Sequence, residues 1–118
     1  MQTKELVTIV KGVLEDMKAR DISVIDVTGL TSITDTMIVA SGTSDRHVKA
    51  IADELVEKMK EIGARPLGVE GAEQGDWVLV DLQEVVVHLM LPRVRDFYNL
   101  EKLWSMTEKQ RESATAQH

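Results

Sequence analysis

Three carboxylates fall in a short stretch of the chain where a metal-dependent enzyme could hold its ions. They are Asp76, Asp81 and Glu84. A nucleotidyl transferase needs two carboxylates on one strand face, two positions apart, to coordinate divalent cations. The residue two positions after Asp81 is Gln83, so that pair is incomplete. We therefore interpret these acids as turn residues that bond to their own backbone.

The histidines and a glycine turn give no stronger sign of catalysis. His47, His88 and His118 are widely separated, without a paired metal spacing such as HExxH. Gly42-Thr43-Ser44 precedes an expected helix, as a phosphate-binding turn does, but lacks the glycine and lysine spacing of known phosphate loops. No serine has a nucleophile motif around it, and the chain has no cysteine. We expect no catalytic residue, no metal site and no cofactor.

All the aromatic residues lie between Asp76 and Trp104, in a stretch that begins with two expected strands, 77–82 and 85–91. Alternation along these strands gives one face that is purely aliphatic, which suits packing under a helix. The other face mixes Trp, Asp, His and Met side chains, which suits a partly open protein-binding face. Trp, Tyr and Arg are the residue types enriched at binding hot spots. They predict a binding cluster of Trp77, Arg93, Arg95, Tyr98 and Trp104. The alternative is that the aromatics fill a small core.

Composition limits the kind of partner. With 118 residues, 43% hydrophobic and 29% charged, the chain suits one ordinary globular domain. The net charge of −6 argues against DNA binding, which needs a basic surface, and permits a basic protein partner. We see no signal peptide, and no apolar run reaches the roughly 20 residues of a membrane helix. We therefore expect a cytoplasmic protein without membrane contact.

Helices and further strands that position these residues follow from periodicity and turn signals. Apolar stripes predict a helix over 3–20, with Thr3 as N-cap, and another over 45–62, capped by Ser44 and ended by Gly63. Short β-branched or apolar runs predict strands at 23–27, 37–40 and 67–70, and short helices are expected at 93–98 and 100–106.

These elements predict one α/β domain over residues 1–106, with a mixed five-stranded sheet and flanking helices. The first two strands could pair as neighbours, and the run from strand 37–40 through the second helix to strand 67–70 is a βαβ unit. Residues 107–118 have no apolar period and are expected to form a disordered polar tail.

The spacing of several segments closely resembles the ribosomal silencing factor family, also called Iojap. The residues that carry the resemblance are Asp35, Gly42-Thr43-Ser44, His47, Glu70-Gly71, Trp77, Asp81, Val85-Val86-Val87-His88 and the run RDFYNLEKLW from Arg95 to Trp104. The resemblance extends over residues 3–106. Two positions depart from the family pattern, since Gln83 stands where glycine is usual and Met90 where phenylalanine is frequent.

The resemblance implies a fold similar to the core of the nucleotidyl transferase superfamily, without its catalytic carboxylates. It implies a non-enzymatic factor that binds the large ribosomal subunit through that subunit's fourteenth protein, a basic protein at the subunit interface. Such a factor blocks joining of the small subunit and represses translation when nutrients are scarce. A role in late assembly of the large subunit and a homodimer in the free protein are also implied.

On this interpretation, the partner-facing residues are Trp77, Asp81, His88, Met90, Arg95, Tyr98 and Trp104. Trp77, Met90 and Tyr98 would supply apolar anchoring. Asp81 would pair with basic side chains, and Arg95 would orient the C-terminal segment. The alternative is a divergent nucleotidyl transferase or nucleotide-binding enzyme, with Ser44 at the phosphates and Asp81 at a metal. A structural adaptor for another basic protein is a third interpretation.

Overall fold

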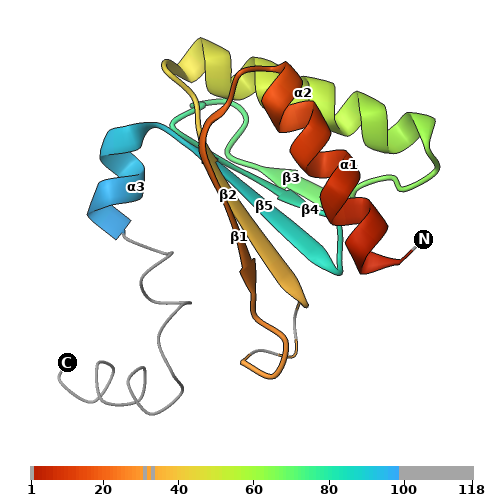
Figure 1. Cartoon of the computed structure of the whole chain (residues 1–118). Coiled ribbons are helices and arrows are strands. Elements are labelled where there is room, and N and C mark those ends of the chain that lie inside the picture. Colours follow the sequence, from red (N-terminus) through yellow and green to blue (C-terminus); the bar gives the residue numbers. More distant parts are fainter. Residues whose placement is uncertain (1, 31, 33, 99–118) are drawn as a thin grey trace, which may run out of the picture.

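Two long helices cover one face of a five-stranded sheet (Figure 1). The structure is a computed structural model, and it describes residues 2–30, 32 and 34–98. The helices are α1 (Thr3–Asp16), α2 (Asp45–Glu61) and the short α3 (Pro92–Tyr98). The strands are β1 (Arg20–Asp26), β2 (Thr36–Ser41), β3 (Gly68–Glu70), β4 (Trp77–Asp81) and β5 (Val85–Met90). The helix expected at 100–106 and the tail at 107–118 lie outside the described residues.

The strand order is β1-β2-β5-β4-β3. Only the central pair, β2 and β5, is parallel, and the other neighbours are antiparallel. The α/β class and the mixed five-stranded sheet are thus confirmed, and so are the pairing of β1 with β2 and the hairpin of β4 and β5. The strands of the β2–α2–β3 unit are not neighbours, because β5 and β4 lie between them.

The two central strands are buried on both faces, except that Val86 of β5 is half-buried. All six residues of β2 are buried, as its continuous apolar run predicts. On the helix-covered face, Ile38 and Leu89 from these strands pack with Leu14 of α1 and Leu55 of α2 in the larger of two apolar cores. Residues 78, 80 and 82 belong to this core too, so the aliphatic face expected of the hairpin is confirmed.

The two long helices end in different ways. α2 begins as expected, because Ser44 Oγ accepts a hydrogen bond from the His47 amide at 3.1 Å. The expectation that α1 continues to residue 20 with Thr3 as N-cap is wrong. Gln2 holds the cap position without a side-chain bond, and the helix stops because Lys18 adopts a left-handed φ of 61°. The Ala19 amide then donates to the Leu14 carbonyl at 2.9 Å.

A second, smaller core lies on the face of the sheet away from α1 and α2. It is formed by Val27, Met37, Val39 and Met90, and Trp77 packs against it. Among the described residues, α3 is the only helix on this side, and it lies at one end of the sheet (Figure 1). We call this surface the open face, and it carries the mixed side of the β4–β5 hairpin.

Candidate protein-binding surface

Strand alternation in β4 divides its side chains between the two faces. Val78 and Val80 are fully buried under the helices. Trp77, Leu79 and Asp81 point to the open face and are half-buried. The expected division into an aliphatic side and a mixed side is therefore observed, and the mixed side reaches solvent.

A hydrogen bond joins Trp77 to His88 on the neighbouring strand. The indole Nε1–H donates to His88 Nδ1 at 3.1 Å, and the ring centroids are 5.9 Å apart. Trp77 lies opposite Met90 in the antiparallel register, so His88 is its diagonal neighbour. The accepting Nδ1 requires a neutral imidazole whose proton is on Nε2.

Burial keeps this imidazole neutral. His88 is 9% exposed, and desolvation lowers its pKa from 6.5 to about 4. An acceptor nitrogen that stays unprotonated near neutral pH holds the indole of Trp77 in one orientation. His88 is therefore a buried, hydrogen-bonded histidine that positions its neighbour.

Met90 does not have the role that was expected of it from the sequence. It was predicted to face a partner, but its side chain is fully buried in the second core with Met37 and Val39. Alternation places it on the open side of the sheet, yet neighbouring side chains cover it completely. Trp77 packs against the core that contains Met90, and the Met90 side chain has no exposed surface that a partner could contact.

Arg95 is also nearly buried, at 9% exposure, and connects α3 to the sheet. Its Nη1 donates to Ser41 Oγ at 3.0 Å, and its Nη2 donates to Ser23 Oγ at 3.2 Å. These bonds join the helix to β2 and β1, in keeping with the orienting role expected of Arg95. The side chain of Tyr98 and all of Trp104 lie outside the described residues.

Asp81 closes the turn of the hairpin. Its Oδ1 accepts a hydrogen bond from the Gln83 amide at 2.8 Å, as expected of a turn acid. Gln83 itself has a φ of 76°, in the left-handed region that favours glycine. Glycine, the residue that the resemblance led us to expect at this position, would adopt this conformation without strain.

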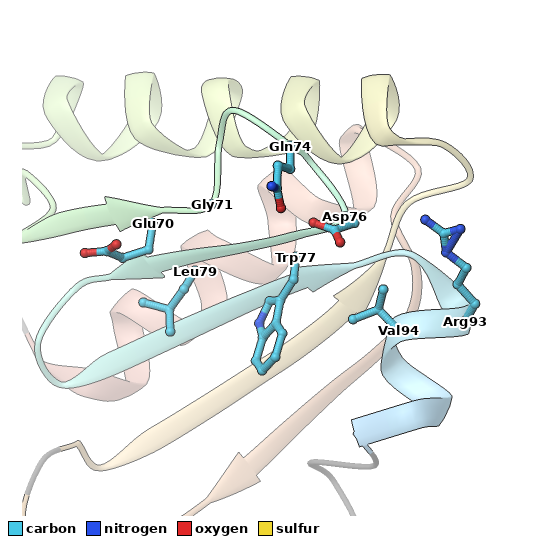
Figure 2. Close-up of a pocket in the computed structure, with 8 residues that line it drawn as sticks. All are labelled: Glu70, Gly71, Gln74, Asp76, Trp77, Leu79, Arg93 and Val94. Atoms are coloured by element: carbon cyan, nitrogen blue, oxygen red, sulfur yellow. The ribbon is translucent and has the colours of Figure 1, made fainter.

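A groove of about 710 Å³ runs along the open face beside β4 (Figure 2). Its walls include Glu70, Asp76, Trp77, Leu79, Arg93 and Val94. Sequence reasoning did not assign Glu70 or Val94 to the site, because they come from β3 and α3, and their meeting beside Trp77 depends on the strand order. Arg93 was named in the expected hot-spot cluster, Asp76 was named among the turn acids, and strand alternation puts Leu79 on the same face as Trp77.

Two glycines hold the loop that borders the groove. Gly71 has a φ of 81°, and a Cβ there would collide with the carbonyl oxygen of Trp77. Gly75 has a φ of 78°, and a Cβ there would lie 3.0 Å from the carbonyl oxygen of Asp45 and 2.7 Å from Lys49 Cε. The Gly75 amide donates to the Gly71 carbonyl at 3.1 Å. The loop is thus packed between β4 and the start of α2.

The residues required by the nucleotide-binding alternative are engaged in structural bonds. The Ser44 hydroxyl caps α2, and Asp81 closes the hairpin turn. His47 Nδ1 accepts from the Thr43 amide at 2.9 Å, and its Nε2 lies 2.8 Å from the Met17 carbonyl oxygen. Within residues 2–30, 32 and 34–98, no three His, Cys, Asp or Glu side chains are grouped as metal ligands would be.

No helix in the described part of the chain combines the length and the apolar character needed to cross a membrane.

Comparison with known proteins agrees with the resemblance seen in the sequence. The family model described as ribosomal silencing factor during starvation matches residues 1–118. The ribosomal silencing factor of Chromobacterium violaceum is 49% identical over 104 residues, which cover 88% of this chain and 85% of that protein. In Mus musculus, mitochondrial assembly of ribosomal large subunit protein 1 is 41% identical over 98 residues, which cover 80% of this chain and 43% of the mouse protein.

A solved structure supports the fold as well. The crystal structure of a protein from Chromobacterium violaceum superposes with a TM-score of 0.87 at 47% identity. The superposition covers 92% of this chain and 90% of that one. Identity at this level over nearly the whole chain, together with the match to the family model, shows that the chain belongs to the family of ribosomal silencing factors.

Proposed function

We propose that this protein binds the large ribosomal subunit through its fourteenth protein and blocks joining of the small subunit, so that translation is repressed when nutrients are scarce. Family membership supports the silencing role. The name of the mouse relative refers to assembly of the large subunit, which supports that subunit as the partner and a further role in its late assembly.

The observation that carries the proposal is the open face of the sheet with its groove. Trp77 lines this groove, and its orientation is fixed by the bond to buried His88. Rigid aromatic anchors beside a groove are typical of binding hot spots. Trp77 and Asp81 reach the surface and remain our contact residues, and contacts by Tyr98 and Trp104 stay predictions.

A basic ribosomal protein fits the charge of the chain. The net charge of −6 favours encounter with a basic partner, because opposite charges speed association. We infer that the protein acts by binding and not by catalysis, and the incomplete carboxylate pair around Asp81 supports this. A ribosomal partner also supports the cytoplasmic location that we propose.

We further infer that the free protein is a homodimer that uses part of the open face. Half-buried apolar side chains at Ile25, Leu30 and Leu79 support such a contact. Self-association and ribosome binding would then compete. Light scattering over a dilution series should show dimers, and addition of the fourteenth protein should yield complexes that contain one copy of this chain. A complex that contains two copies of this chain together with the fourteenth protein would contradict the competition.

A subunit-joining assay tests the proposed function. Purified large subunits are incubated with the protein before small subunits are added, and joined ribosomes are separated by sedimentation. We expect the protein to sediment with the large subunit and the fraction of joined ribosomes to fall as protein is added. A joined fraction that stays constant while the protein is bound would contradict silencing. A protein that stays in the supernatant would contradict ribosome binding.

A further inference from the structure

The groove on the open face has two chemically different ends. Figure 2 shows Glu70 and Leu79 at one end, Arg93 and Val94 at the other, and Trp77 between them. The apolar walls suit the hydrocarbon part of a side chain. Glu70 places an unopposed negative charge at one end, whereas Asp76 and Arg93 carry opposite charges toward the other end. A basic group in the groove is therefore attracted most strongly to the Glu70 end.

The position of Glu70 follows from the edge of the sheet. β3 pairs only with β4, and Glu70 lies directly opposite Leu79 in this antiparallel register. Residues opposite each other across two strands project from the same face. Glu70 is therefore beside Leu79 on the open face, at the outer edge. Gly71 follows at once, and its close approach to Trp77 keeps the chain against β4.

The carboxylate of Glu70 is available to a partner. Glu70 is exposed, and within the described residues its carboxylate makes no hydrogen bond or ion pair. Asp81, by contrast, already uses one carboxylate oxygen on the Gln83 amide. Glu70 can thus supply a charge contact in addition to the one expected at Asp81.

We propose that the groove binds one basic side chain, arginine or lysine, of the protein partner, with its charge at Glu70 and its alkyl part against Leu79 and Trp77. Long basic side chains bury their hydrocarbon stems on apolar surface while the charged head stays at the rim. Toward the far end Arg93 offsets the negative charge of Asp76, so the net negative charge of the groove lies at Glu70 and fixes the direction of the bound segment. This inference rests on the proposed function, because it names the partner chemistry of the same surface.

A pair of charge reversals tests the groove. Glu70→Lys places a cation in the groove, and Glu73→Lys makes the same charge change three residues later, in the loop that follows β3 and outside the groove walls. Both variants change the net charge of −6 equally. The dissociation constant for purified large subunits is measured at low and at high salt, and thermal unfolding confirms that each variant is folded.

We expect Glu70→Lys to weaken binding about tenfold or more, because like charges placed together at an interface are strongly unfavourable. Glu73→Lys should weaken it by no more than about threefold, as a change in long-range attraction does. Glu70→Gln, which keeps the shape of the side chain, should weaken binding less than Glu70→Lys and reduce its dependence on salt.

Equal weakening by the two reversals would overturn the groove inference, because only the overall charge would then matter. Glu70 variants that bind as the wild type does would also overturn it, and the proposed function would stand. Failure of the wild-type protein to bind large subunits is a separate result that contradicts the proposed function itself.

Discussion

The face of the sheet under α1 and α2 is packed with aliphatic side chains, whereas the open face combines a smaller apolar core with hydrogen bonds between polar groups. Val78 and Leu89 are representative of the first, being fully buried beneath the helices. On the second, Trp77 bonds to His88, and Arg95 bonds to hydroxyl groups of the sheet. Aliphatic packing stabilises without regard to direction, but hydrogen bonds fix orientation. The comparison indicates that one face provides stability and the other holds side chains in place for recognition.

The largest effect should come from a cavity on the covered face. Leu55→Ala removes a fully buried side chain from the larger core, so we expect a loss of about 2–5 kcal/mol in the free energy of unfolding. Val24→Ala, at a side chain that is 42% exposed, is the control and should lose less than about 1 kcal/mol. Urea unfolding measures both, and equal losses would contradict the assignment of this face to stability.

The open face should make stability depend on pH through His88. Its folded pKa of about 4 lies below the ordinary 6.5, so the folded protein binds fewer protons than the unfolded chain between these values. The His88 contribution is therefore fully present above pH 6.5 and is lost as the pH falls to about 4, by up to about 3 kcal/mol.

Comparison with His88→Gln isolates this contribution, because both proteins keep the same carboxylates. The free energy of unfolding is measured at about pH 7.5 and about pH 4.5. We expect a smaller loss in the variant than in the wild type. An identical loss in both proteins would mean that His88 is not a buried neutral imidazole.

A somewhat smaller effect should follow from loosening α3. Arg95→Met removes the bonds to Ser41 and Ser23, and hydrogen bonds to a charged group contribute about 1.5–3 kcal/mol. Faster amide hydrogen exchange is expected in α3, with little change in α2. Arg93→Met is the matched control on the same helix, because within the described residues Arg93 has no such bonds. Equal exchange in the two variants would show that Arg95 does not anchor the helix.

The smallest effect should come from the hairpin turn that carries the open face. Gln83→Gly relieves the left-handed φ of 76°, so we expect a gain of about 0.5–1 kcal/mol in the free energy of unfolding. Gln74→Gly, at a position without a left-handed φ, should be neutral or destabilising. A loss of stability in Gln83→Gly would contradict the strain inferred at the turn.

Sequence reasoning recovered the parts of this molecule that depend on local pattern. Strand alternation placed Val78 and Trp77 on opposite faces of β4, and Ser44, a typical N-cap residue, located the start of α2. The end of α1 was missed because Lys18 adopts a left-handed conformation without the glycine that usually signals it. These successes and this failure have the same origin, because each prediction used only neighbouring residues.

The site was harder to predict, because its contacts join residues far apart in the chain. The bond from Trp77 to His88 depends on strand register, and Glu70 meets Leu79 only because β3 pairs with β4. Strand alternation also indicates which side of the sheet a side chain faces, but not whether other side chains cover it there. For this reason Met90 was assigned to a partner although the second core encloses it.

The dissociation constant for purified large subunits, measured for Trp77→Ala and Val24→Ala, tests the central claim that the open face is the docking surface. Val24 pairs with Ile38 of the larger core, so it lies on the helix-covered side of the sheet at its opposite edge. With both variants shown to be folded, Trp77→Ala should bind at least about thirtyfold more weakly, as loss of a hot-spot residue does, and Val24→Ala should bind like the wild type. Wild-type affinity in Trp77→Ala would contradict the claim.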